Sequence, residues 1–556
     1  MNRFAVVIAV LVSALPAQDD AMVKAIIKEG SEGSRVMAHL NHLTNKIGPR
    51  LTSSDRLNQA ADWAVAQFKS WGLDARKEQW GTMPVGFNRG PSSGWMLEPE
   101  RRGLTFSTSA WSAGTTGKQK GDAVLAPKDQ DGVEALGKSV AGKWVVHYPT
   151  ARGRRGRRGG GNQKDQMNPA AFRRLGELCR LHGALGTITT SGQAIVRTSG
   201  RWRIKWDDLP TEVRITLVKD DFDAIVKSLK GAQGSSVVLS FDIRNWFKKG
   251  PIPLYNVIAD LKGSTKPDEY VVIGGHLDSW DGATGTTDNG TGSSTTLEAA
   301  RILATAGAKP KRTIRFMLWS GEEQGLLGSA AWCKKHQAEL DAISGCFVHD
   351  GGTNYVAGVR GTPTQQEQMQ KAFVHCKKVS AELEFNIGET GRLSGGGSDH
   401  GSYLSHGIPG YFWSQKGKAV YTYGWHTQND TYDLAVPKYQ KHSATVIALG
   451  ALGVANLDKK LDRTNLRSTS ERARLNRNLG LQFERGTLKV SGFANERGVG
   501  ARSGIKKGDV LMQLDGVNLK GDRFVLRAAA NNGEPKKKLV VHREGKPIEI
   551  NVSWRR

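Results

Sequence analysis

The residues best suited to chemistry in this sequence combine imidazole and carboxylate groups and follow short apolar runs. His276 and Asp278 close one such run, and Asp288 comes twelve residues after His276. The other members of the set, in chain order, are Glu322, Glu323, Asp350 and His426. Because the carboxyl ends of strands in an open α/β sheet face one crevice, we expect these side chains to converge. Imidazole plus carboxylate is the ligand set of zinc and similar divalent ions.

A division of labour follows from the chemistry of a two-ion centre. Such a centre needs a bridging carboxylate, for which Asp288 is the natural candidate, and can activate a hydroxide and polarise a carbonyl. Glu322 and Glu323 are adjacent at a strand end and point in different directions, so one can bind metal while the other transfers a proton. Each pair taken alone is more typical of a solvated turn, but their order and shared setting favour a site.

The chain from about residue 22 to 455 resembles the co-catalytic zinc aminopeptidases of metallopeptidase family twenty-eight, most closely their carboxypeptidase Q-like branch. The segments that carry the resemblance are residues 47–53 (Ile-Gly-Pro-Arg-Leu-Thr-Ser), 274–281 (Gly-Gly-His-Leu-Asp-Ser-Trp-Asp), 320–329 (Ser-Gly-Glu-Glu-Gln-Gly-Leu-Leu-Gly-Ser), 398–400 (Ser-Asp-His), and His426 with Asp430 and Thr431. As a set these motifs are highly specific for the family.

The resemblance implies a role for each residue. One Zn²⁺ is expected on His276, Asp288 and Asp350, and a second on Asp288, Glu323 and His426; other divalent ions suit the same ligands. Glu322 is expected to act as the general base, which takes a proton from the metal-bridging water and passes it to the leaving amine. Asp278 is expected to orient His276 and fix its tautomer.

Four further residues are expected to shape the substrate pocket. Asp399 and His400 follow from the third motif, and Tyr421 or Tyr423 is a candidate to assist the oxyanion. For each of the four, simple packing is the alternative interpretation.

Short β-type runs alternate with helical stretches from Tyr255 onward, which predicts an α/β domain whose mainly parallel sheet is sandwiched by helices. The expected organisation is a signal peptide (1–17), a peptidase domain in two parts (18–112 and 248–457), a β-rich insert resembling a protease-associated domain (113–247), a linker (458–475) and a small PDZ-like β domain (476–556). In the last, Leu479, Gly480 and Leu481 resemble a loop that binds a C-terminal carboxylate.

The first seventeen residues have the pattern of a secretory signal. A single Arg precedes an apolar run from Phe4 to Leu15, which is too short to span a bilayer. After it no stretch approaches the ~20 apolar residues of a membrane-spanning helix, so we expect no such helix in the mature chain. The expected location is therefore periplasmic or extracellular.

Charge is distributed unevenly along the chain. The 556 residues carry a formal net charge of +26, and only four are Cys, which excludes a disulfide scaffold. Residues 151–205 hold 13 basic and 2 acidic side chains, and residues 471–556 hold 19 and 9. The Arg/Gly-rich run at 152–161 favours a solvated insertion. Because the basicity lies outside the catalytic segments, the expected partner is an anionic envelope or polysaccharide. We expect no specific binding of nucleic acid.

These observations predict a secreted, zinc-dependent exopeptidase that cleaves N-terminal peptide bonds of peptide substrates. A carboxypeptidase or dipeptidase with the same centre is the first alternative. A binding protein on an inactive peptidase scaffold is the second; it is disfavoured because all five ligand positions and Glu322 are present.

Overall fold

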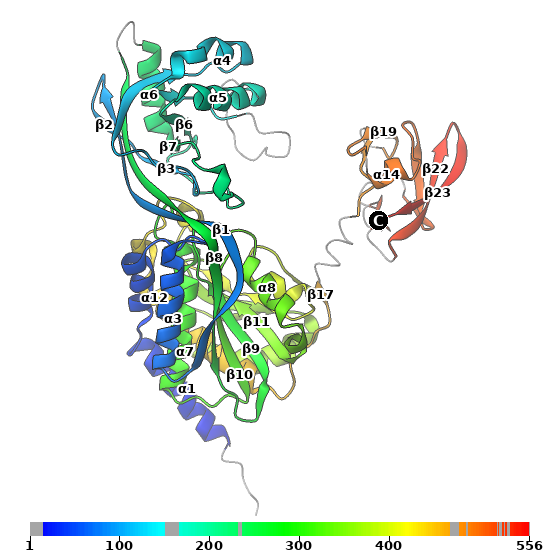
Figure 1. Cartoon of the computed structure of the whole chain (residues 1–556). Coiled ribbons are helices and arrows are strands. Elements are labelled where there is room, and N and C mark those ends of the chain that lie inside the picture. Colours follow the sequence, from blue (N-terminus) through cyan, green and yellow to red (C-terminus); the bar gives the residue numbers. More distant parts are fainter. Residues whose placement is uncertain are drawn as a thin grey trace, which may run out of the picture. The chain divides into compact units, whose positions relative to one another are not determined.

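A computed structural model describes residues 15–150, 166–231, 236–467, 477–484, 487–496, 498–519, 521, 525–526, 529–530 and 534–554 (Figure 1). The chain divides into two compact units, which are treated separately. The first comprises residues 1–403 and 408–465, and the second comprises residues 404–407 and 466–556.

A mainly parallel sheet forms the centre of the first unit. Its strands run in the order β15 (Gly410–Phe412), β11 (Ile343–Val348), β9 (Lys266–His276), β10 (Arg312–Trp319) and β8 (Val238–Leu261). The first four are mutually parallel, and β8 is antiparallel to β10. Every residue of β10 and β11 is buried, as expected for strands covered on both faces. The predicted α/β fold with a mainly parallel central sheet is confirmed.

Helices cover both faces of this sheet. Figure 1 shows α1 (Leu15–Ser31), α3 (Asp55–Ser70), α7 (Thr291–Thr305) and α12 (Pro437–Asn456) on one side and α8 (Leu327–Lys335) on the other. The Ser54 hydroxyl caps α3 by accepting a hydrogen bond from the Leu57 amide. Smaller elements of this unit include α2 (Val36–Asn41), η1 (His42–Ile47), η6 (Thr286–Gly290), η7 (Gln337–Ala342), β12 (Tyr355–Gly361), α9 (Gln366–Phe373), β13 (Asn386–Glu389), α10 (His400–Leu404), β16 (Ser414–Lys416), α11 (Tyr421–Gly424) and η10 (Tyr432–Leu434).

Two long antiparallel strands connect the central sheet to an insert. β1 (Asp74–Glu98) pairs with β8 along almost its whole length. The insert, defined here as residues 99–237, continues the sheet in the order β4 (Gln119–Leu125), β5 (Trp144–Val146), β6 (Gly186–Thr190), β7 (Arg214–Leu217) and β3 (Phe106–Thr108), and it adds β2 (Arg102–Gly103), α4 (Gln130–Leu136), α5 (Pro169–His182) and α6 (Lys219–Gly231). β3 precedes residue 113, where the sequence predicts the insert to begin.

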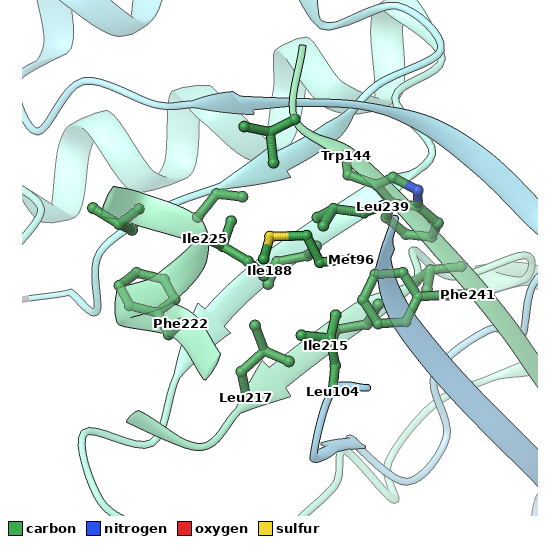
Figure 2. Close-up of a cluster of buried hydrophobic side chains, with 14 of the residues drawn as sticks. Met96, Leu104, Trp144, Ile188, Ile215, Leu217, Phe222, Ile225, Leu239 and Phe241 are labelled. Atoms are coloured by element: carbon green, nitrogen blue, oxygen red, sulfur yellow. The ribbon is translucent and has the colours of Figure 1, made fainter. Parts of the chain in front are cut away.

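The long strands also complete the core of the insert. Figure 2 shows Met96, from β1, and Phe241, from β8, beside Trp144 and Ile188 of the insert's own strands. Trp144 meets Phe241 edge-on with ring centroids 4.8 Å apart. One pair of strands therefore contributes side chains to both the central and the inserted sheet.

The second unit is a small β structure. A sheet in the order β21 (Val517–Asn518), β20 (Val510–Leu514), β22 (Lys536–Arg543) and β23 (Lys546–Ser553) accompanies a hairpin of β18 (Leu481–Phe483) and β19 (Val490–Phe493) and a short helix, α14 (Val499–Arg502). Leu479 is buried, and Gly480, at φ +70°, precedes β18. The Gly480 carbonyl accepts hydrogen bonds from the amides of Ala494 and Asn495.

Three predicted features fall partly or wholly outside the described residues. They are the signal segment up to α1, the Arg/Gly-rich run at 152–161, and the expected linker from residue 468 onward. The first residues of the expected linker pack against the core: Leu461 is buried, and Arg463 donates to the carbonyls of Leu340 and Ile343. Among the described residues, no helix has the length and apolar character needed to cross a bilayer.

Candidate metal centre

Five side chains form two groups that could each hold a metal ion. One is His276, Asp288 and Asp350, and the other is Asp288, Glu323 and His426. One Asp288 oxygen, Oδ1, lies 3.0 Å from His276 Nε2, and the other, Oδ2, lies 2.9 Å from His426 Nε2. His276 Nε2 is 3.2 Å from Asp350 Oδ1, and His426 Nε2 is 2.9 Å from Glu323 Oε2. Asp288 therefore presents one oxygen to each group.

Strand ends bring these residues together. His276 is the last residue of β9, Asp350 follows β11 by two residues, and Glu323 lies in the loop after β10. Because the three strands are parallel neighbours, their carboxyl ends open at one edge of the sheet. Asp288 lies in η6, directly before α7, and His426 lies just after α11.

Buried Arg50 holds the loop that connects His276 to Asp288. Its guanidinium donates to the carbonyls of Leu277, Thr284 and Gly285 at 2.8–2.9 Å. Burial lowers the pKa of Arg50 to about 10, while nearby carboxylates, Asp430 first among them, oppose that shift. The side chain thus stays charged at neutral pH. It lies within the 47–53 motif, yet sequence reasoning gave it no role.

Asp430 is a second supporting residue, which belongs to the family motifs of the sequence but had been given no role. Its carboxylate accepts hydrogen bonds from the amides of Thr287 and Asp288, at 2.5 and 3.1 Å. Burial raises the pKa of Asp430 to about 7, and the charge of Asp288 acts in the same direction. These bonds fix the backbone of the shared ligand. The sequence signal was that Asp430 belongs to the same family motif as His426, four residues after it.

Asp278 contacts His276 in a different way from that expected. His276 Nδ1 donates to the Asp278 backbone carbonyl at 2.9 Å, while the nearest carboxylate oxygen is 3.6 Å away. This bond places the proton on Nδ1 and leaves Nε2 free to act as a ligand. The Asp278 carboxylate accepts from the Thr52 hydroxyl (2.8 Å) and from the amides of Glu322 (3.4 Å) and Glu323 (3.3 Å). It therefore orients the Glu-Glu loop.

Glu322 belongs to neither metal group but lies beside them. Burial raises the pKa of Glu322 well above its ordinary value, and the carboxylates of Asp350, Asp399 and Glu323 add to this effect, whereas the charge of His276 opposes it. A carboxyl that neighbours a metal group without joining it is suited to carrying a proton.

The four predicted pocket residues occupy different environments. Asp399 is fully buried, and burial, reinforced by the charges of Asp278 and Asp350, raises its pKa to about 7. His400 is buried and meets Phe412 with ring centroids 5.6 Å apart. Tyr421 stacks on Trp425 with centroids 6.1 Å apart, and the pKa of Tyr421 is raised, chiefly by burial and then by Asp288. Tyr423 leaves 49% of its surface exposed.

The charges of the two groups fit divalent cations. Without a metal, burial and the charge of Asp288 raise the pKa of Glu323 to about 8. Hydrogen bonds and charges of Asp288 and Glu323 raise the pKa of His426 to about 10 against the opposing effect of burial. Carboxylates packed this closely in the interior are stabilised by positive charge, which bound cations can supply in addition to Arg50.

Metal binding should therefore release protons. At pH 7 His426 and Glu323 hold protons in the metal-free protein and must lose them to act as ligands. Affinity should therefore rise with pH, more steeply below about pH 8 and then up to about pH 10. Calorimetric titration with Zn²⁺ in two buffers of different ionisation enthalpy should give different apparent enthalpies, with at least about one proton released per chain. Identical enthalpies in both buffers would contradict this assignment.

Comparisons with known proteins find the chain similar to peptidases. Residues 256–450 match Peptidase family M28, and the matched region includes all five residues of the two groups. Carboxypeptidase Q of Mus musculus is 26% identical over 459 residues, covering 81% of this chain and 92% of that protein. Carboxypeptidase Q of Homo sapiens is 27% identical over 457 residues, covering 80% and 90%.

A solved structure supports the fold. The Peptidase M28 precursor from Shewanella amazonensis SB2B is 28% identical, covers 80% of this chain and 98% of its own, and superposes with a TM-score of 0.56. A zinc aminopeptidase from Bacillus subtilis is 17% identical over 78% of this chain, with a TM-score of 0.49.

Proposed function

We propose that this chain, which matches peptidase family M28 at residues 256–450, is an exported two-zinc exopeptidase that removes N-terminal residues from peptides. The observation that carries the proposal is the position of Asp288, whose two oxygens face two separate histidines. A single-ion centre has no need of such a bridge. When bound, the two ions polarise the scissile carbonyl and lower the pKa of a water molecule.

The residues of the chain divide the remaining work. Glu322 accepts the proton of the attacking water and returns it to the leaving amine. Asp278 fixes the loop that carries Glu322 through the Glu322 amide. Asp399 and His400 are proposed to shape the substrate pocket. Tyr421, which is largely buried near Asp288, is the better placed of the two tyrosines to donate to the oxyanion.

Cleavage at the C-terminus, or of dipeptides, is the second candidate. It is favoured by the relatives named carboxypeptidase Q, which are aligned with about four-fifths of this chain. The two metal groups are compatible with either direction of cleavage, because bound ions would polarise the reacting carbonyl, which both reactions share.

A panel of short peptides tests the proposal. Tripeptides with free ends, with an acetylated N-terminus, and with an amidated C-terminus should be incubated with the Zn²⁺-loaded protein, with and without a chelator. We expect hydrolysis of the free and C-amidated peptides and loss of all activity with the chelator. Hydrolysis that survives N-acetylation but not C-amidation would show carboxypeptidase activity instead of aminopeptidase activity. The absence of hydrolysis from every sample would indicate a binding protein.

The accessory parts suggest further partners. We propose that the insert is of the protease-associated type and that the second unit is PDZ-like, with Leu479, Gly480 and Leu481 facing a C-terminal peptide. The basic runs of both parts suit an anionic envelope or polysaccharide surface.

A further inference from the structure

A short segment of the insert reaches the loop that carries a metal ligand. This segment, here called the arm, is residues 194–200, and the loop is residues 425–428. The Thr198 amide donates to the His426 carbonyl at 2.6 Å, and the Thr198 hydroxyl lies 3.2 Å from the same oxygen. Thr198 also lines the cavity that includes Asp288 and Glu323. The arm is therefore in contact with the centre itself.

The contacts involve every residue of the loop. Val196 exchanges hydrogen bonds with Gln428: its amide donates to Gln428 Oε1 at 2.7 Å, and its carbonyl accepts from the Gln428 amide at 3.2 Å. Arg197 forms an antiparallel bridge with Thr427. The Arg197 guanidinium donates to the Trp425 carbonyl at 3.1 Å and lies 5.0 Å from that ring's centroid. The arm thus pairs with the loop like an added strand.

The loop needs such support because of its backbone. His426 has φ +57°, a left-handed conformation that costs a non-glycine residue free energy unless the surroundings fix it. Its ring is fixed on one side by Trp425, with ring centroids 4.2 Å apart. Its carbonyl is fixed by Thr198. Releasing the arm would allow His426 to relax and would withdraw Nε2 from Asp288 and Glu323.

The arm is itself anchored at both ends. Towards the C-terminal end, the Ser199 carbonyl accepts from the Ala110 amide at 2.8 Å, and just beyond it Ile204 is buried in an apolar cluster that includes Trp111 and Leu51. Before the arm, the Gln193 carbonyl accepts from the Lys219 amide at 2.8 Å. The arm also packs closely against the core: a Cβ added to Gly282 would lie 1.8 Å from Thr198 Cγ2.

From these contacts we infer that the insert completes the metal centre, with Thr198 as a positioning residue for His426. This inference rests on the proposed metal centre and adds a structural coupling to it: the ion held by Asp288, Glu323 and His426 depends on the arm, whereas the ion held by His276, Asp288 and Asp350 does not. The arm contacts no ligand of the latter group through any hydrogen bond among the described residues.

Four variants of the full chain test the inference. Thr198→Val removes one hydroxyl with little change in shape, and Gly282→Ala pushes on the arm from the core side, where φ lies outside the left-handed region. Thr198→Ser keeps the hydroxyl and removes only the methyl group. Thr189→Val is the matched control, because the buried Thr189 hydroxyl, in β6 of the same insert, has no hydrogen-bond partner among the described residues.

The readouts are Zn²⁺ affinity, measured by competition with a chromogenic chelator, and the visible spectrum of the Co²⁺-substituted protein. In Thr198→Val the affinity for the ion held by Asp288, Glu323 and His426 should fall about three- to tenfold, as for loss of one hydrogen bond, and in Gly282→Ala it should fall further. Thr198→Ser and Thr189→Val should match the parent protein. In Thr198→Val and Gly282→Ala, only the Co²⁺ bands of the site that includes His426 should shift. Parental affinities and spectra in both Thr198→Val and Gly282→Ala would overturn the inference, as would an equal loss at both sites. Failure of the parent protein to bind Zn²⁺ would instead refute the proposed function.

Discussion

Glu322→Gln should lower the rate of peptide hydrolysis by at least about 10²–10⁴-fold, the usual contribution of a general acid–base group, while leaving the bound metal in place. The amide has almost the shape of the carboxyl but cannot accept a proton from water. Glu322 is absent from both metal groups, so its replacement removes no ligand. The expected result is loss of turnover with little change in substrate binding.

The measurement pairs initial rates with metal content determined by mass spectrometry. Glu367→Gln is a suitable control, because Glu367 forms an exposed ion pair with Lys371 and has no part in the site. If Glu322→Gln lost an ion together with its activity, Glu322 would be a ligand and not a base. Near-normal turnover in a fully loaded variant would remove it from the mechanism.

Sequence patterns predicted the central fold well because the strands are strongly apolar. β10 and β11 are buried throughout, so their composition alone marks them as interior strands. The ligands could be predicted because they follow these strands directly, and a parallel sheet brings successive strand ends to one edge. Local pattern and tertiary position coincide at these places.

The supporting residues could not be predicted in this way. Arg50 and Asp430 act through backbone amides and carbonyls that are distant in sequence, such as the 227-residue separation between Arg50 and Leu277. A hydrogen bond to backbone leaves no trace in the identity of its partner. Thr198 illustrates the same point, because nothing in a lone Thr of the insert indicates contact with a loop more than two hundred residues away.

The orientation of Asp278 shows a further limit. Its position two residues after His276 correctly indicated proximity, but the atoms in contact are the backbone carbonyl and the imidazole Nδ1. The carboxylate is directed to the amides of the Glu-Glu loop instead. Sequence spacing specifies neighbours, whereas the choice between a backbone and a side-chain acceptor depends on local torsions that only the structure defines.

Asp288→Ala should have the largest effect on the centre, because it removes an oxygen from both metal groups at once. We expect the affinity for both ions to fall. The rate of hydrolysis should fall by more than about 10–100-fold, which is the cost of losing a supporting partner. Asp350→Ala and His426→Ala each remove a ligand from one group only. Each variant should therefore bind one ion more weakly and the other with parental affinity.

Metal stoichiometry after dialysis against increasing chelator separates these outcomes. The parent protein should retain two ions per chain, Asp350→Ala and His426→Ala one, and Asp288→Ala fewer than one. Asp62→Ala, a change at an exposed side chain outside the site, serves as the control. If Asp288→Ala kept one ion with parental affinity, Asp288 would belong to a single group and the bridge would be wrong.

A difference between Asp350→Ala and His426→Ala in the affinity for the remaining ion would rank the two groups. That ranking can be set beside the Thr198→Val result, because among the described residues the arm is hydrogen-bonded to the loop of His426 and to no ligand of the other group.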